Sequence, residues 1–211
     1  IWASLPLVNP SKHQNAIAEA IKKLQNIDSG DLCQRNGVFM DYLQNGITVA
    51  YHDGKEIRHD IIYLVDYENV HRNTFHIVNQ WTYVEKSEKR ADLIVFINGL
   101  PLVLIELKSP SREETDASAA YRQIKNYMFE IPSMFTYNAF CVMSDMMCSK
   151  AGTITSSEDR FMEWKTKDGN YESTQYADYD TFFEGIFPKE RILDIIKNFT
   201  CFSHEEKGSA K

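Results

Sequence analysis

Two apolar runs joined by an Asn-Gly pair constrain the fold of this chain more than any other feature. Residues 93–97 and 100–105 are almost entirely apolar, and Asn98-Gly99 stands between them. Asn-Gly flanked by hydrophobic runs is a strong signal for a β-hairpin. Because apolar residues occupy both alternate sets of positions, we expect central strands with helices packed on both faces. The sequence therefore predicts an α/β domain with a mixed central β-sheet flanked by helices.

Charged residues stand at the outer ends of these two runs. Asp92 opens the first run, and Glu106 and Lys108 close the second. Burying two carboxylates and an ammonium group is costly unless they pair with each other or hold a metal. Side chains alternate between the two faces of a strand, so Glu106 and Lys108 lie on the same face. The pattern predicts a functional site at this end of the sheet.

Whether Asp92 reaches that site depends on the register of the hairpin. A two-residue turn pairs Ile97 with Leu100 and leaves Asp92 and Glu106 on opposite faces. A three-residue loop pairs Ile97 with Pro101 and brings Asp92 opposite Glu106. We therefore predict an odd-length loop or a β-bulge, because only that register lets both carboxylates hold one cation.

The three charged side chains are those that metal-assisted phosphodiester hydrolysis requires. Carboxylate oxygens suit magnesium, which polarises the phosphate and lowers the pKa of a bound water, and a lysine can orient or activate that water. In the alternative, Glu106 and Lys108 form a solvated ion pair at a strand end and Asp92 is incidental. Glu-x-Lys is common by chance, so the tripeptide alone favours this alternative. The long apolar context counts against it.

Composition limits the remaining function classes. The 211 residues are 43% hydrophobic and contain no membrane-length apolar run, which predicts one soluble, cytoplasmic domain. Four scattered cysteines suggest neither a disulfide framework nor a zinc site. The net charge of -7 counts against binding of nucleic acid by bulk electrostatics, but it leaves metal-dependent nucleases possible. The phosphate-binding loop of nucleotide hydrolases is absent, so this chain should not hydrolyse ATP.

Periodicity and turn signals place the other elements. We expect an N-terminal arm, a helix opened by a Ser11–Gln14 capping box, a polar loop over residues 26–36, and strands over 47–51, 57–67 and 75–83. A helix capped by Ser111 or Thr115 and ending at Pro132 should follow the central hairpin. It carries Gln123 and Tyr127 on one face. Beyond it we expect a strand over 140–143 and helices over 156–165 and 191–199.

Several other residues are assigned structural roles. The spacing of the histidines suits no familiar metal site, and the aromatic and methionine groups are typical of core residues. We assign His52, His59, His71 and His76 to surface or core, Trp81, Tyr83 and Phe96 to the core, and Met146-Met147 to gap-filling near a strand end.

The segments around the hairpin carry a resemblance to a known family. Arg90-Ala91-Asp92, residues 97–103 and Ile105-Glu106-Leu107-Lys108 resemble the nuclease domain of the motor (R) subunit of type I restriction enzymes, a branch of the PD-(D/E)xK nucleases. The resemblance covers most of residues 45–200. It includes segments 65–67, 73–75, 78–80, 123–127, 131–138, 144–145, 151–153 and 160–165.

The resemblance implies roles for individual residues. Asp92, Glu106 and the backbone carbonyl of Leu107 would hold Mg²⁺, and Lys108 would serve the nucleophilic water. Gln123 and Tyr127 would contact DNA or support the catalytic residues. Two features depart from the family. Ala91 replaces the usual proline, which removes no ligand, and the chain begins after a family helix that carries a further glutamate.

The resemblance also implies a domain organisation and partners. Residues 1–44 would be an arm and helix packing on the core, 45–200 the nuclease domain, and 201–211 a linker towards translocase domains. The expected activity is that of a type I site-specific deoxyribonuclease, which cuts double-stranded DNA after ATP-driven translocation by those other domains. ATP serves only the full-length subunit, methylation and specificity subunits are the expected protein partners, and no membrane is involved. The alternatives are a non-catalytic docking or DNA-binding module and a related nuclease outside restriction systems.

Overall fold

A mixed five-stranded sheet organises the computed structural model, which describes residues 1–28, 30–109, 117–170 and 179–201. In sheet order the strands are β3 (Phe75–Val84), β4 (Glu88–Ile97), β5 (Leu100–Leu107), β6 (Phe140–Ser144) and β7 (Ser149–Gly152). Strands β3, β4 and β5 form an antiparallel meander, β6 runs parallel to β5, and β7 is antiparallel to β6. The predicted α/β fold with a mixed central sheet is confirmed.

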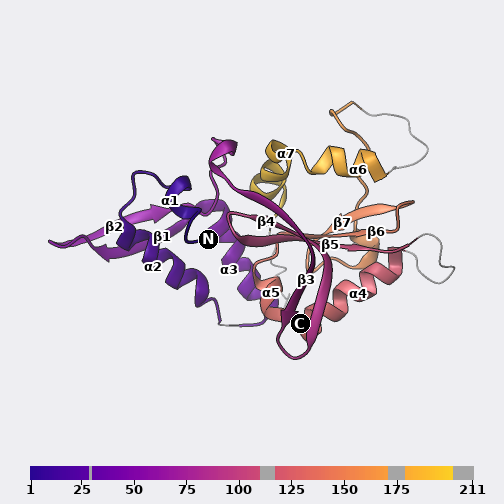
Figure 1. The fold of residues 1–211 in the computed structure, drawn as a ribbon, viewed down its shortest axis with the longest axis horizontal. Coiled ribbons are helices and arrows are strands. Elements are labelled where there is room, and N and C mark those ends of the chain that lie inside the picture. Colours follow the sequence, from indigo (N-terminus) through magenta and orange to yellow (C-terminus); the bar gives the residue numbers. More distant parts are fainter. Residues whose placement is uncertain (29, 110–116, 171–178, 202–211) are drawn as a thin grey trace, which may run out of the picture.

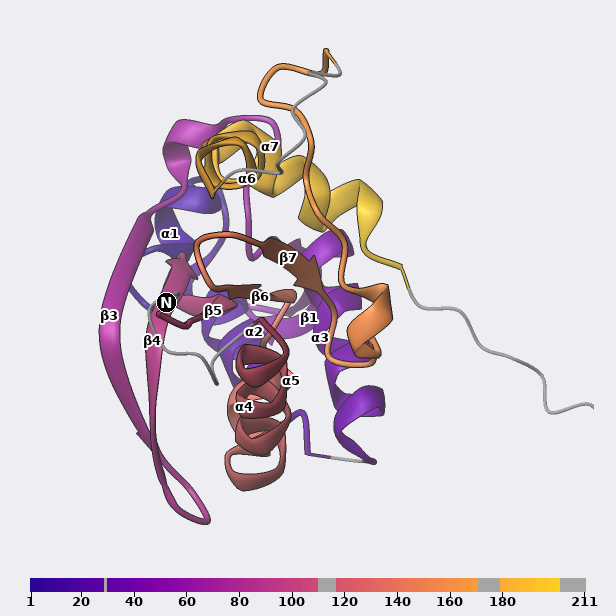
Figure 2. The same cartoon turned by 90° about the vertical axis from the view of Figure 1, so that its right-hand side faces the viewer.

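One face of the sheet is covered by the connection between β5 and β6. Parallel neighbours need a crossover, which here contains α4 (Ala117–Glu130) and the short α5 (Pro132–Thr136). Figure 2 shows both helices on the same side of the sheet. Helix α4 is buried against Leu104 and Cys141 of the sheet through Ala120, Ile124 and Tyr127. This packing places the α4 face beside the carboxyl end of β5.

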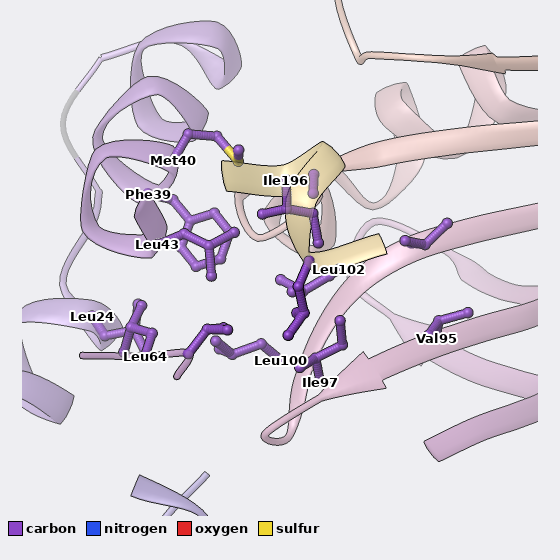
Figure 3. Packing of buried hydrophobic residues seen from close by; sticks show 14 of the residues in the cluster. Leu24, Phe39, Met40, Leu43, Leu64, Val95, Ile97, Leu100, Leu102 and Ile196 are labelled. Carbon is purple, nitrogen blue, oxygen red and sulfur yellow. The ribbon is translucent and has the colours of Figure 1, made fainter. Parts of the chain in front are cut away.

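The opposite face is covered by the C-terminal helices and packs against N-terminal ones. Helix α6 (Tyr179–Ile186) and helix α7 (Lys189–Asp194), which continues as the π turn η3 (Ile195–Phe199), lie on that side (Figures 1 and 2). In Figure 3, Phe39, Met40 and Leu43 gather with Ile196 and Leu102 in one cluster. Both faces of β4 and β5 are therefore packed, as predicted for central strands.

The N-terminal part contributes helices and a separate hairpin. Its elements are α1 (Leu5–Val8), α2 (Gln14–Gln25), α3 (Leu32–Asn45), β1 (Ile47–His52) and β2 (Ile57–Ile62). Strands β1 and β2 lie where strands were predicted and pair antiparallel, and Figure 1 shows them at the end of the molecule away from α4. The predicted strand to Tyr67 is too long, since β2 ends at Ile62 and a 3-10 turn, η1 (Val70–Arg72), precedes β3.

Two N-terminal predictions are wrong. The Ser11–Gln14 capping box does not form, because His13 caps α2 and its ring Nδ1 accepts a hydrogen bond from the Asn15 amide at 3.1 Å. The loop predicted over 26–36 ends early, because α3 begins at Leu32 behind a capping box between Asp31 and Gln34.

A buried polar residue explains why the start of α3 does not show in the apolar pattern. Asn36 lies in the buried stripe of the helix, three residues before Phe39. Its amide donates to the carbonyls of Phe135, Thr136 and Asn138, which lie about one hundred residues later in the chain. Because these partners come from distant segments, the local sequence reads as a polar loop.

The segment after β7 also differs from prediction. No α-helix forms over 156–165. The 3-10 turn η2 (Glu158–Arg160) precedes an extended stretch. In that stretch Met162 exchanges two backbone hydrogen bonds of 2.9 Å with Ala151 of β7. Helix α6 was not expected, whereas a last helix over 191–199 is confirmed by α7 and η3. The predicted caps Ser111 and Thr115 lie outside the described residues, and no helix within the described ranges is long and apolar enough to cross a bilayer.

Candidate active site

The turn between β4 and β5 is shorter than predicted. Asn98 and Gly99 both have positive φ, 53° and 81°, and Ile97 pairs directly with Leu100. This is the two-residue turn that Asn-Gly favours, so a three-residue loop is wrong. The fully buried Asn98 side chain fixes the turn, since it donates to the Leu64 carbonyl at 2.9 Å and accepts from the Thr74 backbone amide at 2.8 Å.

A β-bulge in β5 restores the predicted register. Phe96 pairs with Pro101 but Val95 pairs with Val103, so Leu102 is an extra residue on its strand. The Leu102 carbonyl accepts a hydrogen bond of 2.7 Å from the backbone amide of Ala139, immediately before β6. The bulge that was predicted as an alternative to an odd-length loop is therefore confirmed.

Beyond the bulge, the two carboxylates come together. Leu93 pairs with Ile105, so the next positions on the two strands are Asp92 and Glu106. The Asp92 carboxylate accepts a hydrogen bond from the backbone amide of Leu107 at 2.9 Å. Asp92 therefore lies across the strand pair from the end of β5, as the register argument predicts.

Glu106 is a buried carboxylate with one paired and one unpaired oxygen. It is only 3% exposed, its Oε1 accepts from Lys108 Nζ at 2.7 Å, and its Oε2 has no hydrogen-bond partner among the described residues. Burial raises the pKa of Glu106 above its ordinary value; the bond to Lys108 opposes this shift and the charge of Asp92 adds to it. The ion pair considered as an alternative forms, but it is not a solvated pair, because Glu106 is buried and only Lys108 is partly exposed.

A second Glu-x-Lys in the chain shows what the solvated arrangement looks like. Glu163 and Lys165 approach to 3.8 Å on the surface, with side chains 34% and 56% exposed. The burial of Glu106 therefore comes from its place in the sheet and not from the tripeptide itself.

Helix α4 presents the predicted pair Gln123 and Tyr127 to this end of the sheet. The buried Tyr127 hydroxyl donates to the Arg90 carbonyl at 3.0 Å, next to the strand segment that carries Asp92. Burial, and next the negative charge of Glu106, raise the pKa of Tyr127 to about 12, while a hydrogen bond with Gln123 lowers it. The two helix residues and the two carboxylates therefore act on one another through charge and hydrogen bonds.

Strand β6 fixes the end of β5. Leu107, which was predicted to offer its carbonyl to a metal, pairs with Ser144 in the parallel ladder, and the Lys108 amide donates to the Ser144 carbonyl at 2.8 Å. Leu107 and Lys108 are both partly exposed beside the buried Glu106. The backbone is thus held on both sides of the Glu-x-Lys segment.

An open depression in the surface gives access to these residues. Its lining includes Asp92, Leu107, Lys108 and two residues that were not predicted to belong to the site, Gln80 and Met146. The prediction that Met146-Met147 fills a gap near the strand end is wrong, since these side chains are 59% and 71% exposed. The Trp81, Tyr83 and Phe96 rings, in contrast, pack against one another and against the buried residues between α4 and the sheet, as predicted.

Gln80 is the residue of this site that sequence reasoning missed. Its side-chain amide donates to Asp92 Oδ1 at 3.2 Å, and its backbone has a positive φ of 52°. A glutamine inside a strand carries no turn or motif signal, so only the tertiary structure identifies it.

The donor set suits a hard divalent cation. Among the described residues no three His, Cys, Asp or Glu side chains form a metal-binding group, so the side chains offered here are the two carboxylates. Glu106 Oε2 is buried and unpaired, and the negative charge of Asp92 acts on the same carboxylate. An unpartnered buried carboxylate oxygen is costly unless a cation or a proton satisfies it. Oxygen ligands of this kind suit Mg²⁺ or Mn²⁺. The residues present therefore fit the cation that the sequence led us to expect.

Comparison with known proteins shows the family to which the chain belongs. The family model described as "Type I restriction enzyme R protein N terminus" matches residues 4–160. The "Type I restriction enzyme HindI endonuclease subunit" of Haemophilus influenzae is 34% identical over 206 residues, which are 95% of this chain and 20% of that protein. A putative MjaIXP endonuclease subunit of Methanocaldococcus jannaschii is 30% identical over 95% of the chain and 21% of its own length.

A third relative is covered more completely. The "Type I restriction enzyme EcoprrI endonuclease subunit" of Escherichia coli is 26% identical over 96% of this chain and 69% of that protein. The chain thus spans about a fifth of the length of the first two relatives. Since the family model covers well over half of its residues, the chain belongs to the family of type I restriction enzyme R protein N-terminal regions.

Proposed function

We propose that this chain is the magnesium-dependent nuclease region of a type I restriction enzyme R subunit and that it hydrolyses phosphodiester bonds of double-stranded DNA. One observation carries the proposal: a buried glutamate with an unpaired oxygen, Glu106, stands beside Asp92 and Lys108 at one end of the sheet. Relatives named as endonuclease subunits of restriction enzymes support it.

Each of the three residues has a distinct part in this proposal. Asp92 and Glu106 supply carboxylate oxygens for the cation, with the backbone carbonyl of Leu107 as a further ligand. When bound, Mg²⁺ polarises the scissile phosphate and lowers the pKa of a coordinated water. Lys108, partly exposed in the depression and 2.7 Å from Glu106, balances the carboxylate charge and orients the attacking water.

The helix residues act behind this trio. The Tyr127 hydroxyl donates to the Arg90 carbonyl and so supports the strand that carries Asp92. Gln123, which interacts with Tyr127 and is only partly buried, is able to reach either this network or the DNA backbone. We assign both residues to support of the catalytic carboxylates or to DNA contact.

The remaining activities belong to a longer protein. Because the first two relatives are about five times longer than the matched region, we propose that ATP-driven translocation resides in other domains of the subunit. Methylation and specificity subunits complete the assembly, and this chain itself uses no ATP.

The test uses the complete R subunit assembled with its methylation and specificity subunits, acting on plasmid DNA with ATP and Mg²⁺. Glu106→Ala and Lys108→Ala should each lower cutting by about 100-fold or more, since a catalytic metal site supplies several kcal/mol. ATP hydrolysis should stay at the wild-type rate. Glu163→Ala, in the exposed Glu-x-Lys pair, is the matched control and should cut like wild type.

The outcome also decides between catalysis and docking. If Glu106→Ala and Lys108→Ala both cut as well as wild type, the nuclease proposal is wrong and the chain is a docking or DNA-binding module that keeps the fold. If both lose cutting and keep ATP hydrolysis, assembly and translocation are intact and the lost function is cleavage itself.

A further inference from the structure

Gln80 has a backbone conformation that its place in the sheet does not require. It lies inside β3, yet its φ of 52° falls in the left-handed region, which residues other than glycine and asparagine rarely adopt. Among the described residues only two other non-glycine residues, Asn98 and Met146, have positive φ, and both lie in turns between strands. Backbone strain inside a strand persists when the surrounding structure imposes it, often at a functional site.

The strain coincides with a break opposite Asp92. Strands β3 and β4 pair residue by residue from Phe75 to Val84 with a single gap at Gln80, between the pairs Asn79 with Leu93 and Trp81 with Ala91. The position facing that gap on β4 is Asp92. The two strands run side by side through this region (Figure 2), so the gap is local and the pairing resumes directly after it.

The side chain of Gln80 uses this conformation to reach the carboxylate. Its Nε2 donates to Asp92 Oδ1 at 3.2 Å, while the Leu107 amide donates to Asp92 Oδ2 at 2.9 Å. The carboxylate is thus held from β3 on one side and from β5 on the other. Each oxygen keeps a further acceptor position, so neither bond prevents coordination of a cation. Gln80 also lines the same depression as Lys108.

We infer that Gln80 is a positioning residue that fixes the Asp92 carboxylate for the divalent cation of the nuclease site. The inference rests on the proposed function, since it concerns the same cation. Hydrogen-bond partners that orient a metal-ligating carboxylate contribute to metal affinity, and their loss typically costs about 10- to 100-fold. The strained backbone serves to direct the amide at Asp92 from the neighbouring strand.

The first measurement is the affinity for Mn²⁺ by calorimetric titration of the chain. Gln80→Gly removes the amide but accepts a positive φ, so the variant should fold as well as wild type and bind Mn²⁺ about 10-fold more weakly. Gln80→Asn keeps an amide donor and tolerates the left-handed region, so it should retain more affinity than the glycine variant. Asn79→Ala, an exposed neighbour lining the same depression, is the control and should bind like wild type.

The second measurement is the Mg²⁺ dependence of plasmid cutting by the assembled enzyme. With Gln80→Gly, half-maximal cutting should need about 10-fold more Mg²⁺, and saturating Mg²⁺ should restore a nearly wild-type rate. A merely structural role would change the unfolding midpoint and leave this concentration unchanged.

Two outcomes separate this inference from the proposed function. If Asp92→Asn abolishes Mn²⁺ binding while Gln80→Gly binds like wild type, or if Asn79→Ala weakens binding as much as Gln80→Gly, the positioning role is overturned and the nuclease site stands. If Asp92→Asn binds Mn²⁺ as tightly as wild type, the metal site itself is wrong and the inference about Gln80 falls with it.

Discussion

Replacement of Glu106 by glutamine should stabilise the metal-free fold while it abolishes nuclease function. Glutamine has nearly the same shape as glutamate and carries no charge. The native carboxylate is buried and has one oxygen without a partner among the described residues, while the other accepts from Lys108 at 2.7 Å. The folded chain without metal therefore holds a charge that its surroundings do not fully satisfy.

The magnitude follows from two opposing effects. An unsatisfied buried polar group costs about 1–3 kcal/mol, and Glu106→Gln makes this penalty smaller because the amide is neutral. The variant replaces the ion pair with Lys108 by a hydrogen bond from the charged ammonium group to a neutral amide oxygen, a loss of about 1 kcal/mol, and Lys108, about 20% exposed, still reaches water. We expect a net gain of about 1 kcal/mol in the free energy of unfolding.

The pH dependence follows from the raised pKa of Glu106. Burial lifts this pKa above its ordinary value of 4.5, so the folded state holds the proton more tightly than the unfolded state. Below about pH 4.5 the residue is protonated in both states and costs nothing. As the pH rises from there through the raised pKa, metal-free wild type loses stability relative to the variant, by about 1.4 kcal/mol for each unit of pKa shift.

Urea unfolding between pH 5 and 8 measures this effect, once in EDTA and once in Mg²⁺. In EDTA the variant should be the more stable protein at pH 8, and the difference should shrink towards pH 5. At a Mg²⁺ concentration one hundred times the dissociation constant, wild type should gain about 2.7 kcal/mol and the variant none. Glu163→Gln is the matched control, and it should change stability by less than about 0.5 kcal/mol.

Two results would refute this reasoning. A Glu106→Gln variant that is less stable than wild type by 1 kcal/mol or more at pH 8 in EDTA would mean that Glu106 is held mainly as a structural partner of Lys108. A variant that is stabilised by Mg²⁺ as much as wild type would mean that Glu106 is no metal ligand.

Three further predictions concern the turn, helix α4 and the charge of the chain. Asn98→Ala should lower the free energy of unfolding by about 3 kcal/mol in a urea titration. The variant leaves buried groups such as the Leu64 carbonyl unpaired and puts alanine at a positive φ. A loss below about 1 kcal/mol would contradict the role given to the Asn98 side chain. Tyr127→Phe should keep the packing of the ring and lose the hydrogen bond to the Arg90 carbonyl, which lowers the free energy of unfolding by about 1 kcal/mol. The assembled enzyme should cut about 10-fold more slowly. Unchanged cutting would show that Tyr127 does not belong to the site. The 211-residue chain alone should cut plasmid poorly at moderate salt, since a net charge of -7 gives little non-specific affinity for DNA; efficient cutting would show that other domains are not needed for binding.

Much of the candidate site could be predicted from local patterns. Alternation along a strand puts Glu106 and Lys108 on one face, and helical spacing puts Gln123 and Tyr127 on another shared face. Two strand segments that are apolar on both faces, 93–97 and 100–105, predict cover on both sides, which α4 and the C-terminal helices provide. These statements need only the period of each element, and a short window of sequence contains it.

Other parts depend on contacts between distant residues. The first turns of helix α3 contain the buried polar residue Asn36, whose partners, such as the carbonyl of Asn138, lie far along the chain. The segment after β7 is extended because it pairs with Ala151 and not because of its own composition. Gln80 likewise has no local signal, since its role depends on Asp92 in the neighbouring strand.

The register of the hairpin shows how the two kinds of information combine. The sequence by itself determined that a site with both carboxylates needs Asp92 opposite Glu106, because side chains alternate with a period of two. It also contained Asn98-Gly99, whose preference for a two-residue turn opposes that register. Only the tertiary structure decided the outcome: Leu102 is accommodated as a bulge, because its side chain packs in the core and its carbonyl pairs with the start of β6.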